Sequence, residues 1–212
     1  MRRQNSVRDE SGAWEKEYLC KGSVWGGAVH HLLVLPQGSR VLELGCGNGK
    51  TLSAMIGRCW DVTAIDFSSR AVAMNRMNTG TLQKSEVCVA DARHMPFAHC
   101  GFDAVFAIHI LSHLNKTDRT RAVAEAVRVL KMGGLLYFSG FSTQDFRSGK
   151  GSAVEPGTVK RGSGICTHYF TEPETQDLFS NLMLETITTE RWSMRVRGQD
   201  FPRAEIQAAF IK

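Results

Sequence analysis

The stretch of sequence that decides the fold is VLELGCGNGKT, residues 41–51. An apolar run ends in glycines at positions 45, 47 and 49, and a helical pattern follows. Glycine takes a positive φ easily and lets a ligand lie against the main chain. A helix that starts just after such a turn also points unpaired N–H groups at the ligand. The pattern predicts a strand over 40–44, a ligand-binding turn and a helix over 49–58. A glycine-rich loop that binds nothing is the alternative.

Strands and helices alternate after this turn. Apolar runs predict strands over 62–65, 87–90, 102–108 and 135–139, separated by helical patterns at 68–80 and 118–131. This alternation indicates an α/β fold with a single Rossmann-like, doubly wound sheet and helices on both faces. Four residues fall where predicted strands end: Gly45, Asp66, Asp91 and His109. Ligands bind at that edge of such sheets, so we expect the site there.

The rest of the chain predicts no second domain. Residues 143–168 are rich in Gly, Ser and Lys and lack periodicity, which is typical of a lid, a binding loop or a disordered segment. A capping box at Thr171 then opens a helix, and strands over 184–192 and 205–211 follow. We expect one domain over 1–212 in four segments: a helical cap (1–37, with helices at 11–19 and 28–35), a cofactor-binding core (38–142), a variable loop (143–170), and a closing helix with two strands (171–212).

Composition narrows the function. The formal net charge is +5, but residues 143–212 hold nine basic and nine acidic side chains, so the excess is spread thinly over 1–142. Three arginines at 191, 195 and 197 alternate with apolar residues, as on a strand with one solvated and one packed face. Nucleic-acid binding is therefore not indicated. The six cysteines show no paired spacing for a metal. With no apolar run of about 18 residues and no signal peptide, we expect a cytoplasmic protein away from membranes.

The acidic residue after the glycine turn helps to identify the ligand. Asp66 lies 21 positions past Gly45 (66 − 45), where a carboxylate can accept both hydrogens of a ribose diol. A nicotinamide dinucleotide would fit that acid. However, Lys50 stands where the dinucleotide fingerprint has its third glycine, so the glycine spacing disfavours a dinucleotide.

These motifs, taken in order, resemble the class I S-adenosylmethionine-dependent methyltransferases. The resemblance rests on ELGCGNG at 43–49, Asp66, Asp91-Ala92, and an apolar strand that runs into HILSHL at 109–114. It covers about residues 38–142. It implies S-adenosylmethionine as cofactor, S-adenosylhomocysteine as product, and a seven-stranded sheet in the order 3-2-1-4-5-7-6 with strand 7 antiparallel.

The resemblance also implies roles for individual residues. The backbones of Gly45, Cys46 and Gly47 would line the methionine part, and Glu43 would hold its ammonium. Asp66 would bind the ribose, Phe67 the adenine face, Asp91 the adenine amino group, and the Ala92 N–H a ring nitrogen. Ile108 and His109 would border the methyl donor. Trp25 is counted with these cofactor-binding residues, with capping of the sheet as the alternative.

The methyl acceptor is not set by these motifs. The segment after the fourth strand lacks the Asn/Asp-Pro-Pro-Phe/Tyr motif of amino-methylating nucleic-acid enzymes, and no Pro-Cys nucleophile of the cytosine C5 class is present. The chain is more similar to small-molecule methyltransferases, including the tellurite-resistance-like and thiol enzymes. We therefore expect transfer to a small molecule, mainly by proximity and alignment. The alternatives are an RNA- or protein-modifying enzyme that uses the 143–168 loop, and a non-catalytic cofactor-binding protein.

Candidate acceptor-side residues come from both ends of the chain. They are Tyr18, Trp25, His109, Cys166, His168 and Tyr169, with His109 and Tyr18 as candidate catalytic groups. For His109 and His113 the alternative is a packing role. For residues 164–170 the alternative is an ordinary strand that leads into the capped helix.

Overall fold

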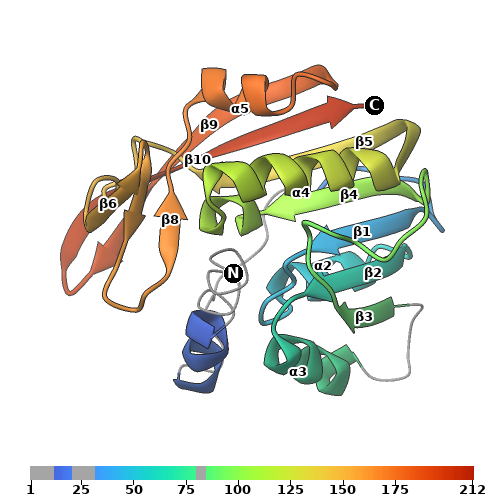
Figure 1. Cartoon of the computed structure of the whole chain (residues 1–212), viewed down its shortest axis with the longest axis horizontal. Helices are drawn as coiled ribbons and strands as arrows, with labels where there is room; N and C mark the ends of the chain where they lie inside the picture. Colours follow the sequence, from blue (N-terminus) through green and yellow to red (C-terminus); the bar gives the residue numbers. More distant parts are fainter. Residues whose placement is uncertain (1–11, 21–31, 80–84) are drawn as a thin grey trace, which may run out of the picture.

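A seven-stranded sheet forms the centre of the molecule in the computed structural model, which describes residues 12–20, 32–79 and 85–212 (Figure 1). Its strand order is β3-β2-β1-β4-β5-β10-β9. The strands are β1 (Arg40–Leu44), β2 (Asp61–Asp66), β3 (Ser85–Val89), β4 (Phe102–Ile108), β5 (Leu130–Phe141), β9 (Met183–Val196) and β10 (Gln199–Ile211). Only β10 runs against its neighbours β5 and β9. This confirms the predicted order, since β9 and β10 are the sixth and seventh strands along the chain that join this sheet.

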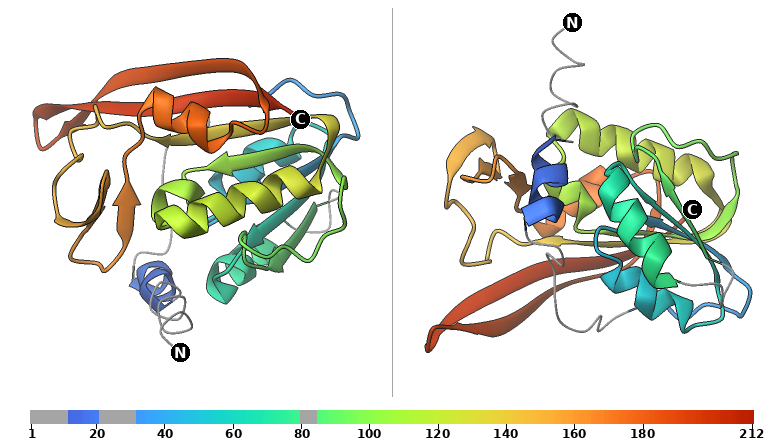
Figure 2. Two further views of the ribbon diagram at one scale, coloured as in Figure 1. Left: turned by 45° about the horizontal axis from the view of Figure 1, so that its top comes forward. Right: turned by 90° about the horizontal axis from the view of Figure 1, so that it is seen from below.

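Helices cover the two faces of the sheet (Figure 2). On one face α4 (Lys116–Val129) and α5 (Glu172–Leu178) pack over a core that includes Val105, Phe138 and Phe210. On the other face α2 (Lys50–Ile56) and α3 (Ser69–Thr79) pack over residues such as Val41 and Phe106. Burial of both faces explains why the central strands read as continuous apolar runs. No helix in the described ranges is long and apolar enough to cross a membrane.

Two predicted helices differ from the structure. The helix predicted over 118–131 begins earlier, because Asn115 caps it by accepting from the Asp118 N–H at 3.0 Å. It ends at Val129, and β5 starts at once, so Gly133 and Gly134 lie inside a strand rather than at a helix end. Of the helix predicted over 28–35, the described part, 32–35, has no helical structure.

The predicted loop at 143–168 contains a small three-stranded antiparallel sheet. Its strands are β6 (Ser152–Glu155), β7 (Thr158–Lys160) and β8 (Cys166–His168). Polar contacts attach this three-stranded sheet to helices. Glu155 accepts from Arg119 of α4 at 2.9 Å, and His168 lies 2.8 Å from both Thr158 Oγ1 and Glu174 Oε1 of α5. The expectation of an irregular segment was therefore wrong, because partners distant in the sequence order it.

The two closing strands are longer than predicted. β9 has 14 residues and β10 has 13, but β10 pairs with β5 only through Glu205–Ile211. The outer part of the hairpin, residues 190–204, therefore projects beyond the body as a two-stranded arm (Figures 1 and 2). Trp192 and Val196 in this arm are 42% and 40% exposed, so the predicted packed face is only partly covered.

Candidate active site

A cavity of about 700 Å³ opens at the carboxyl ends of the central strands, where the sequence places the site. Ten predicted cofactor-binding residues line it: Glu43, Gly45, Cys46, Gly47, Asp66, Phe67, Asp91, Ala92, Ile108 and His109. The eleventh, Trp25, lies outside the described residues. Residues far apart in the sequence thus meet in one hollow, as the topology requires.

The buried side chain of Asn75 stabilises the glycine turn. Gly45, Gly47 and Gly49 all have positive φ, at 70°, 52° and 79°. Asn75 of α3 donates to the Gly47 carbonyl at 2.7 Å and to the Ala71 carbonyl at 2.8 Å. A Cβ added to Gly49 would lie 1.8 Å from Asn75 Oδ1. Asn75 therefore shapes the turn, a role that sequence reasoning missed because the contact links two separate elements.

Asp66 is buried and supports the same turn. Its carboxylate accepts from the Gly47 N–H and from the Ser68 N–H, each at 2.9 Å. Burial raises the pKa of Asp66, and these N–H bonds oppose the rise. The residue predicted to bind the ribose thus also joins the glycine turn to the start of α3. A carboxylate has about four lone-pair sites, so acceptor capacity is left for a diol.

Glu43 provides the test of whether the cofactor fits. The side chain is 3% exposed, and its Oε2 has no hydrogen-bond partner among the described residues. Burial and the neighbouring Asp66 raise the pKa of Glu43 to about 8. An unpartnered carboxyl oxygen at a cavity wall suits an ammonium, which would favour its charged form. This matches the role that the methionine end of S-adenosylmethionine requires.

Tyr18 lies over the glycine turn. Its hydroxyl is 3.0 Å from where a Cβ on Gly47 would sit, and its ring is 5.7 Å from that of Trp14. Burial, with Asp66 nearby, raises the pKa of Tyr18 above its ordinary value. The hydroxyl therefore keeps its proton. It can donate a hydrogen bond but is a poor general base.

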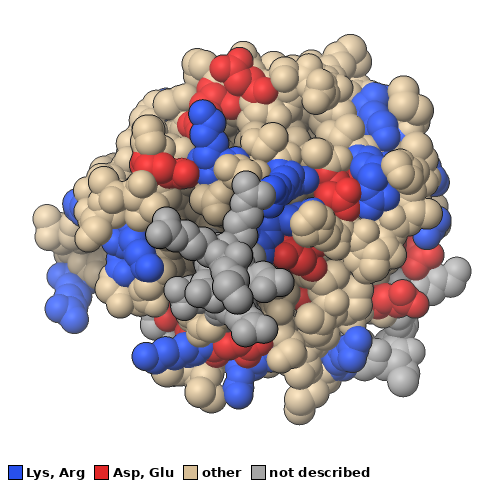
Figure 3. Space-filling view, viewed as in Figure 1, with Lys and Arg blue, Asp and Glu red and all other residues tan. Residues whose placement is uncertain are grey.

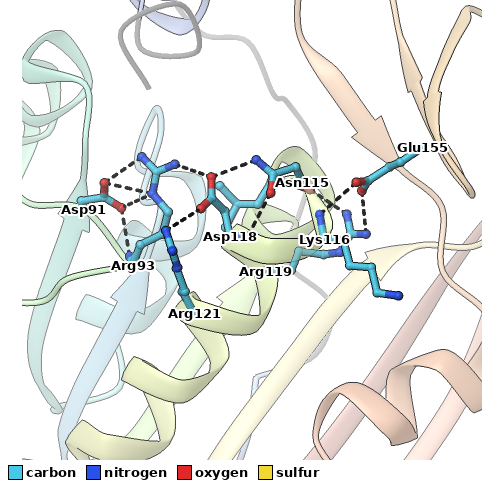
Figure 4. Close-up of polar contacts among 9 residues, drawn as sticks. Asp91, Arg93, Asn115, Lys116, Asp118, Arg119, Arg121 and Glu155 are labelled. Carbon is cyan, nitrogen blue, oxygen red and sulfur yellow. Dashed lines mark hydrogen bonds and ion pairs between the residues drawn. The ribbon is translucent and has the colours of Figure 1, made fainter. Parts of the chain in front are cut away.

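Asp91 belongs to a network of ion pairs and hydrogen bonds (Figure 4). Arg93 Nε and Nη2 donate to the Asp91 carboxylate at 2.8 and 2.7 Å, while Nη1 donates to Asp118 at 2.8 Å. Burial raises the pKa of Asp91, but the hydrogen bonds from Arg93 outweigh it and hold the pKa below its usual range. The carboxylate is thus charged and fixed in place at the cavity wall, where it can accept from an amino group.

The wall beyond these residues is aromatic and acidic. His109 has a φ of 58° and stacks on Phe141, with ring centroids 4.4 Å apart. Its Nε2 lies 3.4 Å from Glu205 Oε2, and Glu205 is paired across the hairpin with Glu190. Burial, together with Lys50 and other cations, lowers the pKa of His109 to about 3, so the imidazole is neutral at physiological pH.

The arm supplies much of this wall, which the sequence did not indicate. Seven of its residues and neighbours line the cavity: Glu190, Arg191, Trp192, Met194, Arg203, Glu205 and Gln207. The Arg203 guanidinium lies 5.2 Å from the centre of the Trp192 ring and forms an ion pair of 2.6 Å with buried Asp145. The alternation of arginines with Trp192 and Met194 was the only available signal.

Three candidate residues do not line the cavity. His168 is buried between Thr158 and Glu174, and the Tyr169 hydroxyl accepts from Arg161 at 2.9 Å. The carbonyl of Cys166 lies 2.9 Å from Nδ1 of His113, a residue of the cavity lining. The strand alternative was the better interpretation of this segment. His113 does line the cavity, and burial lowers its pKa to about 4.

Comparison with known proteins bears on this cavity. A sequence profile described as a methyltransferase domain matches residues 42–138. The chain is 30% identical over 190 residues to a Drosophila melanogaster tRNA N(3)-methylcytidine methyltransferase, covering 81% of this chain and 58% of that protein. It is 32% identical over 142 residues to a malonyl-[acyl-carrier protein] O-methyltransferase of Geobacter sulfurreducens, covering 65% and 52%. The chain thus spans about half the length of these relatives.

The fold also matches a solved structure. A SAM-dependent methyltransferase from Methanosarcina mazei superimposes with a TM-score of 0.71 at 23% identity, covering 84% of this chain and 94% of that one. At this identity the likeness bears on the fold alone.

Proposed function

Because the chain belongs to the class I S-adenosylmethionine-dependent methyltransferases, we propose that it methylates a ring nitrogen of a nucleobase in an RNA. The observation that carries this proposal is the part of the cavity lining formed by His109, Phe141, Trp192 and Glu205, which we call the far wall. The Trp192 ring, which is 42% exposed, and the His109 ring, which stacks on buried Phe141, give flat faces, and Glu205 gives a hydrogen-bond acceptor. Proteins that read an unstacked base use such aromatic faces and bind its polar edge. The similarity to a tRNA cytidine methyltransferase supports the same acceptor, and it favours RNA over the small-molecule acceptor that we expected from the sequence.

In this proposal the cofactor binds at the predicted cofactor-binding residues, which we call the near wall of the cavity. Glu43 pairs with its ammonium, the glycine turn lines its methionine part, Asp66 takes the ribose and Asp91 the adenine amino group. When bound, S-adenosylmethionine supplies a methyl group already activated by a positively charged sulfur. The protein's own task is then to align the acceptor with that methyl and to exclude water.

The acceptor atom determines whether a base is needed. A ring nitrogen such as N3 of cytosine would use its lone pair to form the new N–C bond as the bond from the methyl to sulfur breaks, with that electron pair going to sulfur. No proton would leave, and the positive charge would pass to the nucleobase. Glu205 and Glu190 are placed to stabilise that charge as it develops. The neutral His109 keeps Glu205 in position rather than removing a proton.

An acceptor panel tests the proposal. The chain is incubated with tritium-labelled S-adenosylmethionine and, separately, total tRNA, free cytidine, thiols and malonyl-acyl carrier protein. The last acceptor is included because of the similarity to the Geobacter protein. We expect label in tRNA, lost in the Glu43→Gln variant. Label in thiols or the acyl carrier protein, with none in tRNA, would refute the RNA acceptor.

A further inference from the structure

A second hollow, of about 480 Å³, lies on the three-stranded sheet. We call it the basic notch; its lining is Lys150, Gly151, Ser152, Lys160, Arg161 and Gly162. None of these six residues lines the large cavity. The notch is therefore a separate feature from the methyl-transfer site.

The notch is cationic without a compensating acid. Three of its six lining residues are basic and none is acidic. Lys150 and Lys160 are exposed, and within the described part of the chain no carboxylate pairs with either ammonium. Arg161 is fixed by donating to the Tyr169 hydroxyl at 2.9 Å, while its Nε is buried and has no hydrogen-bond partner among the described residues. Such a set attracts an anion, because nothing in it offsets the repulsion among the cations.

The backbone holds two of these cations close together. Ser152 pairs with Lys160 across β6 and β7, which brings Lys150 and Lys160 to the same end of the three-stranded sheet. Gly151, with a φ of 148°, passes so close that a Cβ there would lie 2.7 Å from the Lys160 carbonyl. A glycine is thus required where the two lysine-bearing segments meet.

The notch continues onto the arm. Lys150 Nζ lies 4.9 Å from the centre of the Phe146 ring, and that ring lies 4.9 Å from the Phe201 ring of β10. The arm adds exposed Arg195, which is 3.3 Å from Asp200, and Arg197 at the turn. Figure 3 shows separate Lys and Arg side chains at this end of the molecule and also elsewhere on the same face. Through Phe146 and Phe201 the basic notch therefore lies beside β10, whose residues Arg203 and Glu205 line the cavity.

We propose that the basic notch holds a backbone phosphodiester of the RNA acceptor. This inference rests on the proposed function. Contacts to phosphates orient a nucleic acid without reading its sequence, while the base to be modified is bound elsewhere. A phosphate held in the notch would position the strand so that one unstacked base reaches the cavity wall at Trp192 and Glu205.

The test measures binding of an unmodified tRNA transcript by fluorescence anisotropy at several salt concentrations. Lys150→Gln with Lys160→Gln removes two notch charges that make no ion pair with any residue that the structure describes. The matched control, Arg40→Gln with Arg58→Gln, removes the same net charge at the start of β1 and just after α2; both side chains are exposed, and Arg40 lies over the Phe102 ring as Lys150 lies over the Phe146 ring. We expect the notch variant to bind about tenfold more weakly at 0.1 M salt, with a log K against log salt slope smaller by about 1 to 2. The control should match wild type, and all three should bind S-adenosylhomocysteine equally.

Each outcome separates the notch from the proposed function. If wild type methylates the transcript but the notch variant keeps the wild-type slope, the notch proposal fails and the proposed function stands. If binding depends on the notch but no nucleoside is methylated, the notch stands and the acceptor assignment fails. If wild type shows no salt-dependent binding to the transcript, both fail.

Discussion

Replacing Gly49 by alanine should destabilise the protein far more than the same change at Gly38. Both glycines have a left-handed backbone, with φ of 79° and 73°, so both variants lose about 1–2 kcal/mol for placing a Cβ there. At Gly38 nothing lies within 4 Å of the added Cβ. At Gly49 the Cβ meets Asn75 Oδ1 at 1.8 Å, so Asn75 has to move.

The movement of Asn75 determines how much more stability Gly49→Ala loses than Gly38→Ala. Its amide would release the buried Gly47 carbonyl, and an unsatisfied buried acceptor costs about 1–3 kcal/mol. We expect the free energy of unfolding to fall by about 1–2 kcal/mol in Gly38→Ala and by about 3–4 kcal/mol in Gly49→Ala. The glycine turn would also change shape, so Gly49→Ala should bind S-adenosylhomocysteine at least tenfold more weakly.

Urea unfolding followed by circular dichroism measures both variants. Asn75→Ala provides the coupling test. In the Gly49→Ala background, removing Asn75 should cost much less than in wild type, because the clash has already broken its contacts. Equal losses at Gly38 and Gly49, or full additivity with Asn75→Ala, would refute the view that Asn75 holds the turn.

Three further predictions concern the cavity. The pKa of Glu43 is raised from 4.5 to about 8, so the folded state keeps a proton that the unfolded state has lost; stability should fall as pH rises from about 4.5 to 8, and Glu43→Gln should flatten that part of a urea-unfolding pH series. Asp66→Ala should weaken cofactor binding more than tenfold, as measured by calorimetry. It should also lower the free energy of unfolding by about 2–4 kcal/mol, because the Gly47 and Ser68 N–H groups lose their acceptor. Unchanged affinity in a folded variant would place the ribose elsewhere. Glu205→Gln should lower kcat about tenfold or more with cofactor affinity unchanged; an unaltered kcat would remove Glu205 from the reaction.

The cofactor half of the site could be predicted from sequence because the fold carries it. Once strand ends are located, the topology of a parallel sheet brings Gly45, Asp66, Asp91 and His109 to one edge, whatever the packing details. Short-range spacing was enough for this step. The spacing did not show that Asp66 also accepts a hydrogen bond from the Gly47 N–H, or that Arg93 already donates to the Asp91 carboxylate.

The acceptor half depends on contacts that no local pattern encodes. Glu205 meets His109 only because β10 inserts beside β5 and its hairpin extends past the sheet edge. The three-stranded sheet was missed for a related reason. Its strands are three or four residues long and are fixed by Arg119 and Glu174 from helices outside the segment. Apolar periodicity is weak over so short a length, so tertiary contacts decide the structure.

The most direct test of the proposed function is the position of the transferred methyl group. Unmodified tRNA is incubated with the chain and S-adenosylmethionine carrying a deuterated methyl group, digested to nucleosides and analysed by mass spectrometry. Transfer to a ring nitrogen, with charge passing to a base beside Glu205 and Glu190, predicts a labelled nucleoside with a fixed positive charge, such as 3-methylcytidine. That product should be absent with Glu43→Gln and much reduced with Glu205→Gln. Label on a carbon or an oxygen, or no labelled nucleoside with a chain that binds the cofactor, would contradict it.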